Sequence, residues 1–250
     1  LNTTIETVTA VAGDTTATVT WNDSHRVGTS VTDVSTFAAE HSTEYIGISQ
    51  QTVSQSFVPT QTGSLSKVVL RVARSTGTES LKLELFAGTS DVRTGSALAT
   101  VIKSSGNIPQ TFADVEFAIA AGVNLIAGTQ YVLVLSSNSN GTYTWKYTSA
   151  DYVAGVTLAT SDGGTTWNAT NRDTVFATEI APYLPDTYTV EKSANGITWT
   201  VDTSTMTSST SPTSYTLTNL ANGAPVYIRV TNVTNNTQDP SAIVAVTPRK

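Results

Sequence analysis

Two strand-like segments of one small β-sandwich lie more than 160 residues apart in this chain, at Thr15–Trp21 and Thr187–Lys192. In the first segment, Ala17, Val19 and Trp21 alternate with threonines. One face of this strand is therefore apolar and is expected to be buried. The second segment is expected to be the next strand of the same sandwich. Everything between them is predicted to be a second domain, inserted into a loop of the first.

The two outer pieces of the chain, residues 1–24 and 183–250, together have about ninety residues, a size suited to one compact sandwich. Asn195-Gly196 supplies the positive φ angles of a two-residue turn, which predicts a hairpin between Thr187–Ser193 and Ile197–Val201. A loop rich in Ser and Thr is expected after the hairpin. Further strands are predicted at Thr4–Val11, Ser214–Leu217, Pro225–Val233 and Ile243–Thr247.

The inserted domain, residues 25–182, is predicted to be a larger β-sandwich. About ten strands are expected between Glu44 and Ile180, a number typical of a double-sheet jelly roll. Tyr131–Leu135 is apolar on both faces, which indicates a central strand covered on each side. No helix longer than a turn or two is predicted. The other clear strands are Leu65–Arg74, Ser80–Phe86 and Val115–Ile119.

Composition also indicates an all-β protein, because Thr is abundant and its branched side chain favours half-exposed sheet surfaces. The net charge of −6 and a pI near 4.8 argue against a nucleic-acid partner, which requires clustered Lys and Arg. No apolar run is long enough for membrane insertion, and no cysteine provides a disulfide or a metal-binding thiolate. Leu1 is not an initiator methionine, which favours a removed leader or a longer parent chain.

Four motifs of the outer pieces form one pattern: Val19-Thr20-Trp21, Tyr188-Thr189-Val190, Ile197-Thr198-Trp199, and Leu220 ahead of Ile228-Arg229-Val230. With this pattern the outer pieces resemble a fibronectin type III domain. The resemblance implies a β-sandwich interrupted after its second strand. In one departure from the family, the alignment places Val226 rather than Tyr227 at the position of the corner tyrosine.

The insert carries a second set of motifs, namely Ser42–Tyr45, Gln55–Phe57, Thr94–Ala99, Ala127–Leu135 and Arg172–Phe176. With these motifs it resembles a jelly-roll module, carbohydrate-binding in character, of the kind seen in bacterial surface proteins and tailed-phage virion proteins. The resemblance implies binding or assembly. It supplies no catalytic residue.

Tyr143, Trp145 and Tyr147 form the most prominent aromatic group, since their i, i+2, i+4 spacing places three rings on one side of a strand. Sugars stack their C–H faces on such rings. The same spacing also describes the buried face of a strand, and we favour that interpretation. A ligand site would then use loop residues, of which Asn140 and Tyr152 lie nearest in the sequence.

The segment Thr160–Trp167 resembles an Asp-box hairpin, in which an aspartate, here Asp162, caps a turn and the tryptophan packs beneath it. We expect a structural role for this hairpin, and Trp167 is a further candidate for ligand contact. Jelly-roll binding modules also often hold a structural Ca²⁺. By analogy with that family, the candidate calcium ligands are Glu44, Asp151, Asp173 and Glu179.

Catalytic groups are scarce. The only histidines, His25 and His41, lie in polar sequence where solvated loops are expected, which leaves little material for a catalytic triad. A glycosidase needs two carboxylates facing one sugar. Asp114 and Glu116 share one face of a strand and Glu84 faces outward on another, as carboxylates of a solvated sheet do. We therefore expect a protein that is not an enzyme.

Two functions remain. The first is an extracellular or virion-surface recognition and adhesion module, whose inserted jelly roll binds a cell-surface or environmental glycan. The second is a structural assembly protein, such as a phage decoration or tail subunit or an extracellular filament subunit, which contacts copies of itself or other surface proteins. We favour recognition, because a long insertion in a sandwich loop displays a binding surface on a rigid base.

Overall fold

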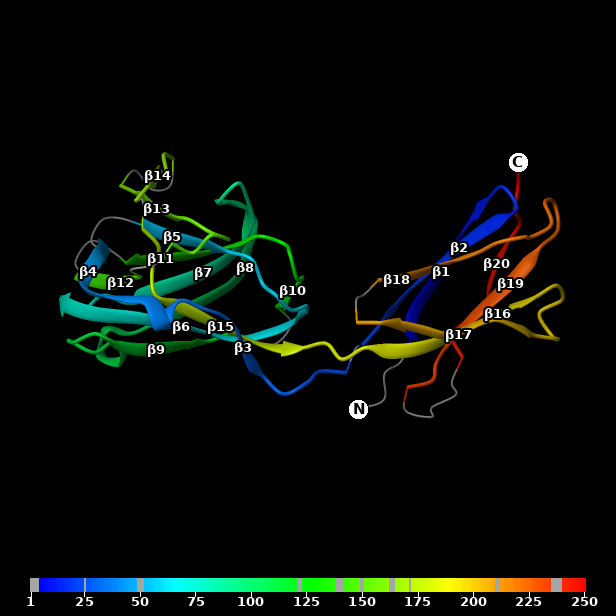
Figure 1. Ribbon diagram of the computed structural model, residues 1–250, viewed down its shortest axis with the longest axis horizontal. Helices are drawn as coiled ribbons and strands as arrows, with labels where there is room; N and C mark the ends of the chain where they lie inside the picture. Colours follow the sequence, from blue (N-terminus) through cyan, green and yellow to red (C-terminus); the bar gives the residue numbers. More distant parts are fainter. Residues whose placement is uncertain are drawn as a thin grey trace. The chain divides into compact units, whose positions relative to one another are not determined.

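The computed structural model describes residues 5–24, 26–48, 52–120, 123–137, 142–148, 151–161, 165–170, 172–209, 212–234 and 240–250, with side chains left undescribed over 39–48. The protein is all-β, built from antiparallel sheets, as the sequence predicts (Figure 1). It divides into two compact units. The split unit comprises Leu1–Gly28 and Tyr183–Lys250, and the inner unit comprises Thr29–Pro182.

The split unit contains two sheets. The first has three strands in the order β1-β2-β18, with β1 at Ile5–Gly13, β2 at Thr16–Asp23 and β18 at Thr213–Leu217. The second has four strands in the order β17-β16-β19-β20. Its strands are β16 at Asp186–Ser193, β17 at Thr200–Ser208, β19 at Val226–Asn232 and β20 at Val244–Val246.

The two sheets of the split unit share one apolar core. Ala17, Val19 and Trp21 of β2 are at most 1% exposed, as the alternation in this strand predicts. The Trp21 ring packs edge-on against Tyr188 of β16, with ring centroids 5.2 Å apart. Two segments separated by the whole inner unit thus meet in one core, because each places its apolar face toward the other.

The connection after β16 differs from the predicted two-residue turn. Residues 194–199 separate β16 from β17, and β17 runs through the Ser- and Thr-rich stretch that the sequence predicts to be a loop. Asn195 caps the turn with its side chain, since its Oδ1 accepts hydrogen bonds from the amides of Ile197 and Thr198, both at 2.9 Å. Within residues 194–199 only Gly196 has a positive φ, of 73°, so the two-residue primed turn, which needs two such residues, does not form.

The inner unit also contains two sheets. One has the order β14-β13-β5-β11-β7-β8, and the other the order β3-β15-β6-β12-β4, with β9 and β10 also paired to β6. The strands of the first are β5 (Thr52–Phe57), β7 (Leu81–Thr89), β8 (Val92–Lys103), β11 (Tyr131–Ser137), β13 (Thr157–Thr160) and β14 (Asn168–Ala169). The strands of the second are β3 (Val31–Ser35), β4 (Glu40–Ile48), β6 (Gly63–Thr76), β9 (Ala113–Ala118), β10 (Asn124–Leu125), β12 (Thr142–Thr148) and β15 (Phe176–Pro182).

The long strand β6 organises the second sheet. Residues 67–72 pair with β9, residues 63–70 with β15, and residues 72–76 with β12. Because a strand has only two edges, β15 and β12 occupy successive stretches of the edge opposite β9. In the described residues the helical segments are two 3₁₀ turns, η1 (Phe37–Ala39) and η2 (Ser105–Asn107), and no helix is long and apolar enough to cross a membrane.

The core of the inner unit lies between its two sheets. From β7 it takes Leu81, Leu83 and Leu85, and from β11 it takes Tyr131, Leu133 and Leu135. The intervening β11 residues Val132 and Val134 are also buried, at 0% and 1% exposure, on the opposite side of the same sheet. The prediction that β11 is covered on both faces is therefore confirmed.

Candidate functional site

The outer face of the six-stranded sheet carries an aromatic and polar surface, which we call the Trp167 face. It is presented by β5, β11, β7 and β8, which are neighbours in the sheet (Figure 1). Alternation along these strands sends leucines inward and the residues between them outward. The surface comprises Ser56, Lys82, Glu84, Phe86, Asp91, Arg93, Gln130, Val132, Val134 and Trp167.

The centre of the Trp167 face is apolar. Trp167 folds back from the loop before β14 and packs on Phe86, Val132 and Val134, and its ring remains half-buried. The guanidinium carbon of Arg93 lies 5.0 Å from the Phe86 ring centroid and 5.9 Å from that of Trp167. Both distances lie within the range of a cation–π contact, so two rings hold this cation in place.

A strained turn closes one end of this face. Ser90 and Asp91, between β7 and β8, have φ of 50° and 66°, a conformation that costs a non-glycine residue about 1 kcal/mol or more. Hydrogen bonds hold the turn: the Asp91 amide donates to Gln130 Oε1 at 2.8 Å, and Asp91 Oδ1 accepts from Gln130 Nε2 at 2.9 Å and from Ser56 Oγ at 2.5 Å. The Asp91 carboxylate is thereby fixed to the sheet.

The other end of the face carries an ion pair. Lys82 Nζ lies 2.9 Å from Glu84 Oε2, and both side chains point outward from β7. The Glu84 side chain is 18% exposed and the Lys82 side chain 41%. Glu84 therefore has a local counter-ion, and the face presents polar groups on both sides of its aromatic centre.

Two of the three predicted stacking aromatics belong to the core. Tyr143 and Trp145 are 0% exposed, and Trp145 Nε1 donates to the Val175 carbonyl at 2.8 Å. The Tyr143 hydroxyl donates to the Glu79 carbonyl. Tyr147 is half-buried. Of the two interpretations of this spacing, burial holds for Tyr143 and Trp145, so neither ring is available for a ligand.

A buried polar cluster lies between the sheets of the inner unit, around Gln55 of β5. Gln55 Nε2 donates to Asp173 Oδ1 at 2.8 Å, and Gln55 Oε1 accepts from Thr157 Oγ1 at 2.5 Å and from the Thr174 amide at 2.8 Å. Asp173 Oδ2 accepts from the Tyr152 amide at 2.8 Å. Burial raises the pKa of the Asp173 carboxyl, although these hydrogen bonds oppose the shift.

Tyr152 belongs to this interior as well as to its loop. Its ring contacts Phe176 edge-on, with centroids 5.7 Å apart, and its hydroxyl accepts from the Val58 amide at 3.3 Å. Burial raises the pKa of this phenol. The other loop candidate, Asn140, lies outside the described residues. Tyr152 therefore anchors its loop to the core.

The four candidate calcium ligands do not gather into one described site. Asp173 faces the interior and bonds Gln55, whereas Glu179 lies 3.1 Å from Lys67 Nζ in an ion pair. Asp151 lies close enough to Asp173 to raise the pKa of its carboxyl. The side chain of Glu44 lies outside the described residues. Over the described part of the chain, no three His, Cys, Asp or Glu side chains come together as a metal site would require.

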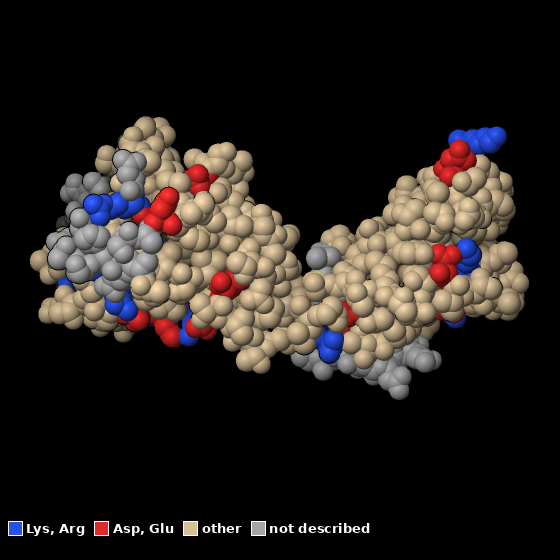
Figure 2. Space-filling view, in the orientation of Figure 1, with Lys and Arg blue, Asp and Glu red and all other residues tan. Residues whose placement is uncertain are grey.

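The remaining predicted carboxylates form ion pairs on the solvent side of the second sheet. Asp114 lies 2.5 Å from Arg71 Nε and Glu116 lies 2.7 Å from Lys67 Nζ. His25, the His41 side chain and the Asp-box residue Asp162 all lie outside the described residues. On the face seen in Figure 2, the described charges are few and both signs are interspersed.

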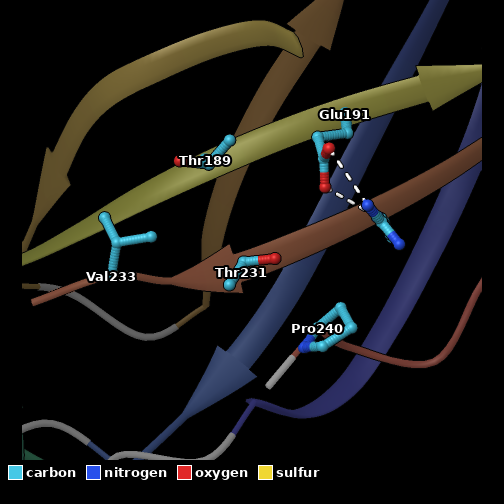
Figure 3. Close-up of a pocket in the computed structure, with 6 residues that line it drawn as sticks. Thr189, Glu191, Thr231, Val233 and Pro240 are labelled. Atoms are coloured by element: carbon cyan, nitrogen blue, oxygen red, sulfur yellow. Dashed lines mark hydrogen bonds and ion pairs between the residues drawn. The ribbon is translucent and has the colours of Figure 1, made fainter. Parts of the chain in front are cut away.

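The split unit has an open groove of about 270 Å³ on its four-stranded sheet, lined by Thr189, Glu191, Arg229, Thr231, Val233 and Pro240 (Figure 3). Glu191 accepts two hydrogen bonds from Arg229, at 2.6 and 3.1 Å, and the guanidinium carbon lies 4.3 Å from the Trp199 ring centroid. The guanidinium of Arg229 therefore has a carboxylate partner on the neighbouring strand of the same sheet. Arg229 contacts a tryptophan ring, as Arg93 does, but unlike Arg93 it also has a carboxylate partner among the described residues.

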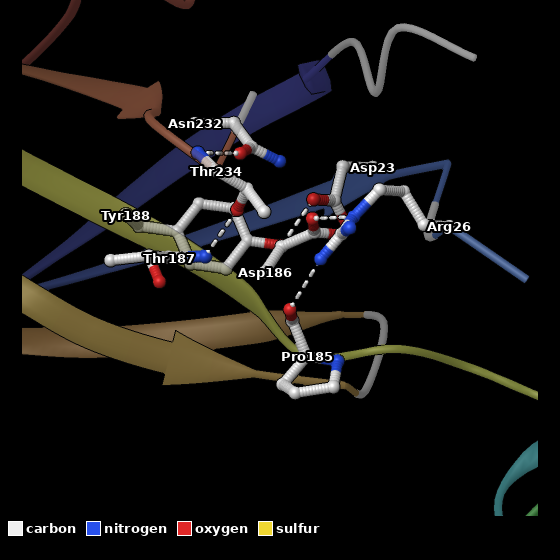
Figure 4. A network of polar contacts seen from close by, with 8 residues as sticks. All are labelled: Asp23, Arg26, Pro185, Asp186, Thr187, Tyr188, Asn232 and Thr234. Carbon is white, nitrogen blue, oxygen red and sulfur yellow. Dashed lines mark hydrogen bonds and ion pairs between the residues drawn. The ribbon is translucent and has the colours of Figure 1, made fainter. Parts of the chain in front are cut away.

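A polar network occupies the end of the split unit where both connections to the inner unit leave it (Figure 4). Arg26 donates to Asp186 at 3.1 Å and to the Pro185 carbonyl at 3.1 Å, and the Tyr188 hydroxyl donates to Asp23. Asp186 is 0% exposed. Burial and the bond to Asp23 raise the pKa of the Tyr188 phenol. These residues connect the two sequence segments of the split unit near the point where the inner unit is inserted.

Sequence patterns indicated Trp167 but neither Arg93 nor the turn that presents Asp91. The available signal is weak, since Ser90-Asp91 at a hairpin turn, with an arginine two residues later, is common on protein surfaces. Neither family models nor curated proteins gave a match to this chain.

Proposed function

We propose that this protein is a non-catalytic recognition and adhesion module that binds a glycan on the Trp167 face of its inner unit. The observation that carries the proposal is the half-buried Trp167 ring, fixed on an apolar sheet face and flanked by Arg93 and by polar groups. A sugar presents a C–H face that stacks on such a ring and hydroxyls that bond the neighbouring polar groups.

The architecture supports this role. A three-stranded sheet β1-β2-β18 facing a four-stranded sheet β17-β16-β19-β20 agrees with a fibronectin type III-like base, and two larger sheets agree with an inserted jelly roll. Val226, aligned where that family has its corner tyrosine, is partly buried and packs against the core. Such a module belongs outside the cell or on a virion surface, in bacterial surface or tailed-phage proteins.

A glycan array with the purified chain tests the proposal. Wild type is expected to show saturable binding, and Trp167→Ala to abolish it. The matched control is Trp199→Ala, which removes a half-buried tryptophan beside an arginine of the split unit and should leave binding unchanged. Absence of saturable binding by wild type, or equal binding by Trp167→Ala, would refute glycan recognition at this face.

Assembly is a second candidate, favoured by one observation. Strand β8 is the edge of its sheet, and it exposes apolar side chains, with Leu98 46% and Ile102 64% exposed. An edge strand of this kind can pair with another chain. If assembly is the function, the mass in solution will rise with protein concentration and Ile102→Lys will suppress the rise. A monomer at every concentration, with no partner in its source particle, would exclude it.

A further inference from the structure

We propose that the glycan bound on the Trp167 face carries a carboxylate, and that Arg93 is the residue that selects it. This inference rests on the proposed function. It concerns the chemical class of the ligand: an acidic saccharide such as a uronate-containing chain, as opposed to a neutral one.

The first observation is that Arg93 lacks a protein counter-ion. Within the described part of the chain, its guanidinium makes the two ring contacts and neither a hydrogen bond nor an ion pair. Three other arginines of the chain each have a carboxylate close by: Arg26 with Asp186 at 3.1 Å, Arg71 with Asp114 at 2.5 Å, and Arg229 with Glu191 at 2.6 Å.

The second observation is that the carboxylates on the same face are engaged elsewhere. Asp91 Oδ1 accepts from Ser56 and Gln130, and Glu84 pairs with Lys82 at 2.9 Å. Arg93 itself follows the strained turn, so the hydrogen bonds that hold Asp91 also fix the start of β8. The cation is thus held in one place with its N–H donors unused by the described residues.

A ligand carboxylate would supply the hydrogen-bond acceptors that the Arg93 guanidinium does not have among the described residues. Guanidinium presents parallel N–H donors that bind a carboxylate in a bidentate fashion, and stacking on aromatic rings leaves those in-plane donors available. A pyranose stacked on Trp167 would place a ring substituent beside Arg93, because the guanidinium carbon lies 5.9 Å from the Trp167 centroid. A sugar acid satisfies both groups at once.

The test compares carboxylated oligosaccharides with their methyl esters, which have nearly the same shape without the charge. A panel of uronate oligosaccharides, the matching esters and the matching neutral sugars is titrated against the full chain by calorimetry. A hydrogen bond to a charged group predicts at least about tenfold tighter binding of the acids. Affinity for the acids should fall with added salt, and affinity for the esters should not.

Variants assign the effect to Arg93. Arg93→Gln should abolish the preference for acids, and Arg93→Lys should retain only part of it, because a lysine lacks the bidentate fork. Arg71→Gln is the matched control: it removes the same charge, beside Phe37 on the other sheet of this unit, and should preserve the preference. Thermal unfolding of each variant confirms that it is folded.

The outcomes separate the two proposals. Equal binding of acids and esters by wild type, or an acid preference that survives in Arg93→Gln, overturns the role of Arg93 and leaves glycan recognition standing. Binding of no saccharide, charged or neutral, overturns glycan recognition itself and this inference with it.

Discussion

Replacement of Gln55 by leucine should destabilise the inner unit strongly, although leucine is apolar and close to glutamine in size. Gln55 is 0% exposed. Its amide nitrogen donates to Asp173 Oδ1, and its carbonyl oxygen accepts from the Thr174 amide. Leucine removes both partners while leaving the carboxylate and the amide buried.

The magnitude follows from those two groups. A buried polar group left without a partner costs about 1–3 kcal/mol, and more if it is charged. The Asp173 oxygen and the Thr174 amide together therefore predict a loss of about 4 kcal/mol. The hydroxyl of Thr157 can rotate toward another acceptor and adds little. Leucine fills nearly the same volume, so a cavity contributes no large further cost.

Urea unfolding, followed through hydrogen exchange of peptides from the inner unit, measures the loss. For a unit of about 150 residues, 4 kcal/mol corresponds to a fall in Tm of roughly 8–16 °C. The control is Gln110→Leu, the same substitution at an exposed position, expected to change stability by less than about 0.5 kcal/mol. If Gln55→Leu costs no more than this control, the buried cluster does not stabilise the unit and the reasoning fails.

Three further predictions concern stability. Because burial raises the pKa of the Asp173 carboxyl, the unfolded state loses this proton at a lower pH than the folded state. Above about pH 4, the free energy of unfolding of wild type should therefore fall relative to that of Asp173→Asn. A difference between the two proteins that does not change with pH would contradict this. Trp145→Ala should cost about 3–5 kcal/mol in urea titrations, since its ring is fully buried, and a cost below 1 kcal/mol would place the ring outside the core. Deleting residues 29–182 and bridging with a short Gly/Ser linker should leave a split unit that is folded by circular dichroism. A longer deletion, of residues 23–182, also removes Asp23 and Arg26 and should lower the Tm of the split unit. A molten product from the shorter deletion would show that the split unit needs the inner unit to fold.

Alternation in the sequence predicted strands best where one face meets an apolar core. β2, β7 and β11 follow their predicted positions closely, because each buries every second side chain in a continuous core. The turn at Asn195-Gly196 was predicted incorrectly, since the Asn195 side chain accepts hydrogen bonds from the backbone amides of Ile197 and Thr198 and the loop is longer than two residues. The stretch after Val201 is strand although its Ser- and Thr-rich sequence indicated a loop, because β16 supplies the hydrogen-bonding partner.

The candidate site was harder to predict than the strands. The i, i+2, i+4 spacing of Tyr143, Trp145 and Tyr147 is the same for a buried face and for an exposed face. In the structure, both sides of β12 are largely covered. Trp167 was a candidate from its hairpin motif. Arg93 gave no local signal, since its proposed role depends on Phe86 of the neighbouring strand and on Trp167, which lies 74 residues later in the sequence.

The sequence by itself determined the all-β class and the apolar faces of the main strands, because side-chain alternation is a local property of an extended backbone. Only the tertiary structure decided which strands are covered on both faces, where Gln55 and Asp173 meet, and that Arg93 packs against two aromatic rings with no carboxylate partner among the described residues. Those outcomes depend on contacts between residues far apart in the chain. The Trp167 face forms because Phe86 of β7, the turn at Ser90 and Asp91, and Trp167 all lie on the outer side of β11, although Trp167 is far from the others in the sequence.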